Sequence, residues 1–136
     1  FGAPFLAPDR LLQTIDPGLL TGTVLRPVEF EPTSNKWAGA LCNGFQIHVT
    51  APDRYKPYET SLEILRAVLK FHQDDFQWKA PPYEYEYEKL PIDLIIGNKK
   101  IRQLIEHLDN IDAIEKSWLN DLEAFAETSR RFHLYT

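Results

Sequence analysis

The side chains best suited to chemistry or recognition form one short polar stretch, Thr33, Ser34, Asn35, Lys36 and Trp37. Together they offer hydroxyls, an amide, an amine and an indole ring. Such groups hydrogen-bond sugar hydroxyls or a carboxylate, and an indole face stacks on a sugar ring. Functional residues concentrate on loops held by rigid elements, which favours a binding site here. A plain turn anchored by its Trp explains the same residues, and the pattern does not separate the two readings.

Alternating apolar and polar residues on both sides of this loop predict the strands that position it. The first strand spans residues 23–31 and the second spans residues 41–50. Successive side chains of a strand point to opposite faces, so Gln46 and His48 share the polar face of the second strand. Such polar side chains can line a pocket, although a hydrogen-bonded surface or semi-buried histidine is the favoured reading of His48. On the first strand, the residues that share the apolar parity are Val24, Val28 and Phe30.

Three helices are predicted by apolar residues that recur every three or four positions. The first covers about residues 58–73 and contains a capping box at Thr60-Ser61-Leu62-Glu63. The second begins after Asn98, and the third begins at Asn110 or Asp112. The apolar stripe of the third helix is Ile111, Ile114, Trp118, Leu122 and Phe125. We therefore expect a single α+β domain, a small twisted mixed sheet with about three helices packed against it.

Three tyrosines, Tyr83, Tyr85 and Tyr87, alternate with glutamates. On an extended chain this spacing places the three rings on one face. Packing of that ladder against a helix is the favoured reading, because aromatic residues are common in strands for this reason, and a sugar platform is the alternative. The glutamates on the other face indicate a solvated edge rather than a cluster of catalytic acids.

Composition excludes several classes of partner. The 136 residues carry a net charge of -5 without a Lys/Arg cluster, which argues against nucleic acid and against a polybasic membrane anchor. No apolar run is long enough to cross a bilayer, so no membrane insertion is expected. The single cysteine, Cys42, rules out an internal disulfide and a cysteine-built zinc site, and we expect a buried inert thiol. The histidines lack metal-ligand spacing and no cofactor motif is present, so we expect neither a metal nor a cofactor.

Motifs in order along the whole chain resemble the C-terminal part of a bacterial family. They are Gly2-Ala3-Pro4-Phe5, Arg26-Pro27-Val28, Lys36-Trp37-Ala38-Gly39, Cys42-x-Gly44-x-Gln46-Ile47-His48-Val49, Pro81-Pro82-Tyr83-Glu84-Tyr85-Glu86, Leu90-Pro91-Ile92-Asp93-Leu94 and Ser117-Trp118-x-x-Asp121-Leu122-x-x-Phe125. This family was long catalogued as a domain of unknown function and is associated with exo-β-N-acetylmuramidases of the NamZ type. The resemblance implies glycosidases of cell-wall recycling that remove N-acetylmuramic acid from the non-reducing end of peptidoglycan fragments.

The resemblance also implies an arrangement of domains. Family members have a larger Rossmann-like N-terminal domain, which carries the principal catalytic glutamate, and a smaller C-terminal domain. Residues 1–136 then correspond to the C-terminal, auxiliary domain, and a chain that lacks Met and starts at Phe1 fits a fragment or a processed piece. No catalytic residue is carried over, and the fragment alone is expected to be inactive. The expected partners are a peptidoglycan fragment or muramic acid glycoside and the protein's own N-terminal domain, and the expected location is periplasmic or secreted.

On this interpretation the polar loop and strand face help to form the substrate pocket. Lys36 would pair with the lactyl carboxylate or a peptide carboxylate. Trp37 would stack on a sugar face, while Gln46 and His48 would hydrogen-bond hydroxyls or hold the loop.

Two alternatives remain open at this point. One is a non-catalytic carbohydrate-binding or protein-interaction module. The other is a complete small enzyme that uses Glu29 or Glu31 together with His48. Glycoside hydrolysis needs two carboxyl groups that flank the bond, and the spacing identifies no such pair.

Overall fold

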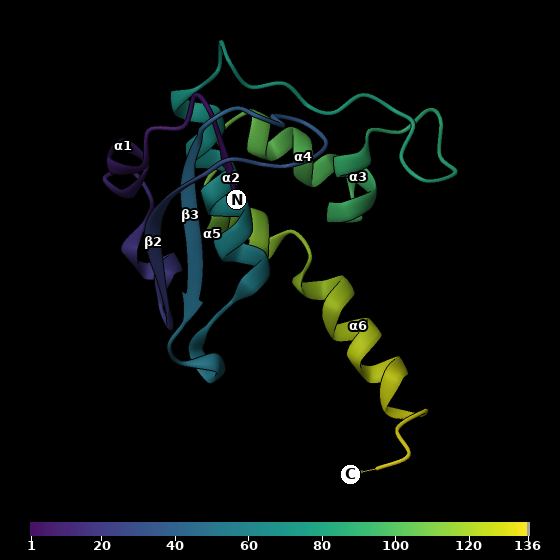
Figure 1. Cartoon of the computed structure of the whole chain (residues 1–136). Coiled ribbons are helices and arrows are strands. Elements are labelled where there is room, and N and C mark those ends of the chain that lie inside the picture. Colours follow the sequence, from purple (N-terminus) through teal and green to yellow (C-terminus); the bar gives the residue numbers. More distant parts are fainter. Residues whose placement is uncertain (136) are drawn as a thin grey trace.

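The computed structural model describes residues 1–135, in which one sheet and several helices pack together (Figure 1). Its three-stranded sheet has the order β1-β3-β2, with β1 at Gly2–Ala3, β2 at Thr23–Phe30 and β3 at Cys42–Val49. The central strand β3 pairs antiparallel with both neighbours. The α+β class is therefore confirmed, and the sheet is antiparallel where a mixed sheet was expected. A short loop returns the chain beside β2, which gives an antiparallel pair and leaves no room for a crossover helix.

Short and long helices complete the domain. Their bounds are α1 Pro8–Leu12, α2 Pro57–Phe71, α3 Pro91–Ile96, α4 Lys99–Glu106, α5 Ile111–Lys116 and α6 Leu119–Arg130, with 3-10 turns η1 at Pro17–Leu20 and η2 at Pro52–Arg54. Pro57 occupies the first turn of α2, where its missing N–H costs nothing. Asn98 and Asn110 cap α4 and α5, because each side chain accepts a hydrogen bond from the backbone N–H two residues later.

The helix α2 lies between two apolar clusters. On the sheet side, Leu25 and Phe45 pack with Ile64 and Val68 of α2 and with buried residues of the N-terminal segment. On the other side, buried residues of α2 pack against α4 and α5; this cluster contains Leu62, Leu69, Ile101, Ile105, Ile111 and Ile114. The stripe predicted for the first helix therefore serves both clusters, which holds the sheet and the C-terminal helices on opposite sides of α2.

The capping-box prediction for α2 is wrong. The helix begins one turn earlier, so Thr60 and Glu63 both lie inside it and are buried. Thr60 Oγ1 donates to the carbonyl of Leu19 at 2.7 Å. The Glu63 carboxylate accepts hydrogen bonds from Arg66 and from the backbone N–H of Asp16. These two side chains tie α2 to the η1 turn instead of closing the end of the helix.

The single C-terminal helix that was expected is divided into α5 and α6. The chain turns at Ser117, whose hydroxyl donates to the carbonyl of Ile114 at 2.6 Å. Ile114 is buried, whereas Leu122 and Phe125 on α6 are exposed. Figure 1 shows why: α6 extends away from the sheet and from the other helices. The predicted stripe is continuous in sequence, but only its first half enters the core.

The prediction that Tyr83, Tyr85 and Tyr87 form a ladder on one face of an extended chain is also wrong. Tyr83 and Glu86 form an isolated antiparallel bridge across a tight turn, in which Glu84 has a φ of 53°. Tyr85 at the turn is 94% exposed and Tyr87 is 71% exposed, so neither ring packs on a helix. Alternation alone does not make a strand, because a strand also needs a neighbouring strand to bond with.

Candidate functional site

The loop between β2 and β3, residues 31–41, is held by backbone hydrogen bonds. The N–H of Gly39 donates to the carbonyl of Pro32 at 3.0 Å, and the N–H of Ala38 donates to the carbonyl of Asn35 at 3.2 Å. Asn35 and Trp37 have φ values of 61° and 69°, a left-handed conformation that side-chain-bearing residues seldom adopt. Such a backbone persists where the surrounding structure fixes it. The loop therefore presents its side chains from a defined backbone.

The side chains of this loop are exposed, but they are not equally free. Thr33, Ser34, Asn35 and Lys36 face outward. Trp37 is 36% exposed, and its ring meets the ring of Phe5 edge-on at a centroid distance of 6.3 Å. The Lys36 amine lies 5.0 Å from the centroid of the Trp37 ring, within the range of a cation–π interaction. Trp37 thus anchors the loop to the N-terminal segment and carries the Lys36 amine above it.

The anchor continues inward to His72, the residue that follows α2. The rings of Phe5 and His72 lie 5.4 Å apart, and His72 is buried. Its Nε2 has no hydrogen-bond partner among the described residues. Burial lowers the pKa of His72; nearby Asp75 opposes this effect and Arg10 adds to it. The buried His72 imidazole therefore packs against Phe5, and Phe5 in turn packs against Trp37.

Gln46 and His48 lie on the outer face of the sheet, opposite the face that packs on α2. Gln46 is opposite Arg26 in the β2–β3 pair, and the Arg26 guanidinium donates to Gln46 Oε1 at 2.6 Å. His48 is opposite Val24, and both side chains are exposed. The apolar residues Val24, Val28 and Phe30 of β2 thus lie on the outer face of the sheet, while Leu25, on the opposite face of the strand, is buried in the core.

The seven predicted site residues therefore form two groups. The loop group is supported by Phe5, and the outer-face group is supported by Arg26. No hydrogen bond between described residues joins the groups. At about 3.3 Å per residue, His48 lies roughly 20 Å along β3 from Cys42, where the loop ends. The loop is the more concentrated set of polar groups.

A catalytic pair of Glu29 and His48 is excluded by the geometry. Glu29 is opposite Asn43, whereas His48 is opposite Val24. Strand alternation places Glu29 on the α2 side of the sheet and His48 on the outer face. Glu31 lies beyond the end of β2 and is farther still along the strand from His48.

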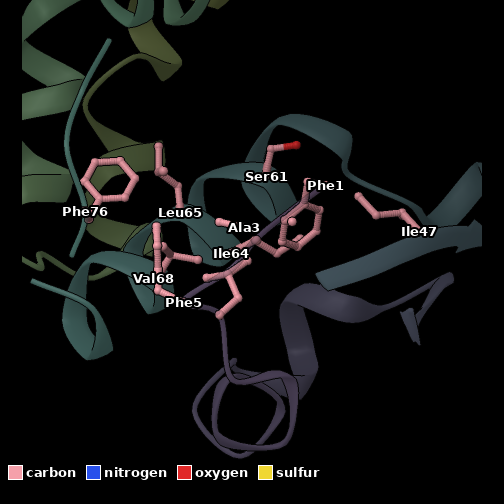
Figure 2. Close-up of a pocket in the computed structure, with 11 residues that line it drawn as sticks. Phe1, Ala3, Phe5, Ile47, Ser61, Ile64, Leu65, Val68 and Phe76 are labelled. Atoms are coloured by element: carbon pink, nitrogen blue, oxygen red, sulfur yellow. The ribbon is translucent and has the colours of Figure 1, made fainter. Parts of the chain in front are cut away.

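An apolar hollow of about 380 Å³ lies between β1, β3 and α2 (Figure 2). Its walls include Phe1, Phe5, Ile47, Ile64, Leu65 and Phe76. The hydroxyl of Ser61 is at the rim and already donates to the carbonyl of Pro57 at 2.6 Å. With no titratable side chain in its wall, the hollow is suited to apolar groups and not to acid–base chemistry.

Two further kinds of feature were sought in the described part of the chain, a metal-binding cluster and a membrane-spanning helix. Residues 1–135 contain no cluster of three or more His, Cys, Asp or Glu side chains arranged to hold a metal ion. Within the same residues, no helix has the length and apolar character that crossing a membrane requires. Cys42 is fully buried, as expected, with its Sγ 3.6 Å from the carbonyl of Ala40.

Sequence reasoning missed the two supporting residues, Arg26 and Phe5. The partner of Gln46 follows from the β2–β3 register, which a hairpin alignment of the two strands could have shown. The Phe5–Trp37 contact joins segments that no local pattern relates. A tertiary structure was needed to find it.

Comparisons with known proteins agree with this description. A sequence profile for the C-terminal part of the exo-β-N-acetylmuramidase NamZ matches residues 1–135. The peptidoglycan β-N-acetylmuramidase NamZ of Bacillus subtilis (strain 168) is 28% identical over 134 residues, which are 98% of this chain and 30% of that protein.

The fold recurs in a solved structure. The crystal structure of a DUF1343 family protein from Bacteroides fragilis NCTC 9343 superposes with a TM-score of 0.77 at 20% identity, covering all of this chain and 35% of that one. The chain thus spans about a third of the length of both relatives. The match over nearly every residue shows that the chain belongs to the family of C-terminal domains of NamZ exo-β-N-acetylmuramidases.

Proposed function

We propose that this domain helps to form the substrate pocket of a peptidoglycan exo-β-N-acetylmuramidase, where it contacts the N-acetylmuramic acid at the non-reducing end. Family membership supports the reaction class, since the Bacillus subtilis relative is a peptidoglycan β-N-acetylmuramidase. On this proposal the domain works beside the protein's own N-terminal domain, and it acts where peptidoglycan fragments occur, in the periplasm or outside the cell.

The observation that carries the proposal is the fixed, polar loop. Four exposed side chains with hydrogen-bonding groups stand on a backbone that Trp37 anchors. Pre-organised polar groups bind a sugar with less loss of conformational entropy than mobile ones. Lys36 is the cation of this loop, so it is the group that would pair with the lactyl carboxylate of muramic acid.

The outer-face group has a different role in this proposal. Gln46 Oε1 already accepts a hydrogen bond from Arg26, and this contact fixes the direction in which the side-chain amide can donate to a ligand. His48 is exposed on the same face, two pairs away along the strands. These side chains would bind a more distant part of the fragment, or the neighbouring domain, rather than the same sugar as Lys36.

The test is hydrolysis of a chromogenic N-acetylmuramic acid β-glycoside by this chain joined to its natural upstream sequence. A charged hydrogen bond to a carboxylate contributes about 1.5 to 3 kcal/mol, so Lys36→Ala should lower kcat/KM by about tenfold or more. The matched control is Lys70→Ala, which removes an exposed lysine at the far end of α2. Equal activity of the two variants would refute the role of Lys36.

A non-catalytic binding module remains the competing function. It predicts that the 136-residue chain alone binds peptidoglycan fragments and that joining it to its upstream sequence yields no hydrolysis. Hydrolysis by the joined protein, with none by the chain alone, supports the proposal made here. Hydrolysis by the chain alone would overturn the assignment of a supporting role.

A further inference from the structure

We propose that the edge of β3 beyond β1 accepts an additional strand of the same polypeptide, the segment that leads into Phe1 when this domain is part of a longer chain. The occupant is an extended backbone that continues the line of β1 and places an apolar side chain in the hollow beside it. This inference concerns the assembly of the domain and is independent of the proposed sugar pocket.

The edge itself is the first observation. Phe1 and Phe45 exchange both backbone hydrogen bonds, at 3.0 and 2.9 Å, so Phe45 directs its N–H and carbonyl toward β1. Alternate residues of a strand direct these groups to the same side, so Ile47 and Val49 also face that side. The pairing of β1 with β3 does not extend to Ile47 and Val49, and no other strand of the described residues lies beside them on that edge. Two successive pairs of backbone groups on the central strand are thus open to a new neighbour.

The hollow is the second observation. Phe1 and Ile47 form part of its wall, and α2 contributes Ile64 and Leu65 to the facing side (Figure 2). Continued in the register of β1, the second position before Phe1 falls opposite Ile47, and the fourth falls opposite Val49. Paired residues of an antiparallel ladder share a face. An apolar side chain at that second position would therefore enter the hollow between Ile47 and α2.

The choice of occupant rests on chain length and direction. The chain covers 30% of one relative and 35% of the other, so the matched proteins contain much additional polypeptide. A strand that runs in the direction of β1 reaches the open edge without a reversal of the chain. Backbone hydrogen bonds with alternate side chains in a pocket are the general mode by which a strand is added to a sheet edge.

The test is amide hydrogen exchange measured by NMR on the 136-residue chain and on the same chain with its natural upstream sequence. We expect the amides of Ile47 and Val49 to exchange at least 100-fold more slowly in the longer protein. The amides of Gln46 and His48, which face β2, are the internal control and should be protected in both. Equal exchange of Ile47 and Val49 in the two proteins would overturn the proposal.

Two shorter extensions test separately whether the edge of β3 can accept a strand and whether the natural upstream segment is that strand. One adds six alternating Thr and Val residues before Phe1, with Val at the position opposite Ile47, and the other adds six Gly and Ser residues. We expect slow exchange of Ile47 and Val49 with the first extension and not with the second. If only the designed strand protects these amides and the natural segment does not, the edge is competent but the proposed occupant is wrong.

Discussion

Replacing Trp37 by Ala tests whether its ring supports the loop. A tryptophan side chain offers roughly 250 Å² of surface. Because Trp37 is 36% exposed, about 160 Å² of this leaves water on folding, worth about 4 kcal/mol at about 25 cal/mol per Å². Alanine keeps part of that burial and the unfolded chain already hides some of it, which reduces the loss to about 2 kcal/mol. The edge contact with Phe5 adds up to about 1 kcal/mol, so we expect a loss of about 2 to 3 kcal/mol.

The assay is urea unfolding followed by far-ultraviolet circular dichroism, which does not depend on the removed indole. An unchanged slope would assign the difference to stability alone. Alanine keeps the Cβ, so the left-handed backbone at position 37 remains equally strained and the change isolates the ring. Lys36→Ala is the matched control, because its exposed side chain should contribute less than about 0.5 kcal/mol.

A Trp37→Ala protein as stable as the Lys36→Ala protein would refute the anchoring argument. The indole would then be free to stack on a sugar, and the variant should lose substrate affinity without loss of stability. A destabilised Trp37→Ala protein that also loses affinity fits an anchor that positions Lys36. In that case Trp37→Phe should restore part of both properties, because a smaller ring keeps some of the contact with Phe5.

Three further perturbations follow from the structure. Burial lowers the pKa of His72 in the folded state, so the neutral imidazole contributes fully to stability above the unfolded pKa of about 6.5, and this contribution is lost as the pH falls below that value. His72→Gln should therefore flatten the pH dependence of the urea midpoint between pH 7 and 5. An unchanged pH profile would contradict the burial argument. Glu63→Ala removes a fully buried partner of Arg66 and should cost about 3 kcal/mol in equilibrium unfolding, whereas a loss below 1 kcal/mol would show that water replaces the pair. Gly44→Ala would make a Cβ clash with the carbonyl oxygen of Phe1, so we expect β1 to detach and the amide of Phe45 to lose hydrogen-exchange protection; an unchanged Phe45 amide would contradict the close approach.

The sequence predicted those parts of the fold that local patterns determine. The alternation in β3 and the helical stripe of α2 are confirmed, as is the start of α4 after Asn98; of the two starts offered for the next helix, Asn110 is its cap. These features depend on neighbours within about four residues, so they leave a local signature. The predictions that failed concern features that depend on residues far apart in the sequence. Thr60 and Glu63 fit a capping box but bond to a distant turn, and the stripe that continues into α6 leaves Leu122 and Phe125 exposed.

The candidate site was predictable in residue type but not in arrangement. The polar loop could be located because it interrupts two alternating segments, and its exposure is confirmed. The alternation in β2 grouped Val24 with the apolar parity, yet Val24 is 53% exposed, whereas Leu25 of the other parity is 5% exposed. Apolar residues at both parities leave the inner face undetermined until α2 is placed. The division of the predicted residues into two groups follows from that choice of face.

The contacts already made in the domain decide which loop and sheet side chains remain free to bind a substrate. Gln46 accepts from Arg26, and the Trp37 ring is packed against Phe5, so a substrate would have to compete with a protein partner at both. Among residues 1–135, Lys36 has a cation–π contact across 5.0 Å and no hydrogen-bond or ion-pair partner, which leaves its three N–H donors available. A carboxylate that approaches the loop from solvent would meet this amine without breaking a hydrogen bond within the protein. Among the predicted residues, Lys36 therefore offers the clearest separation between an effect on binding and an effect on folding.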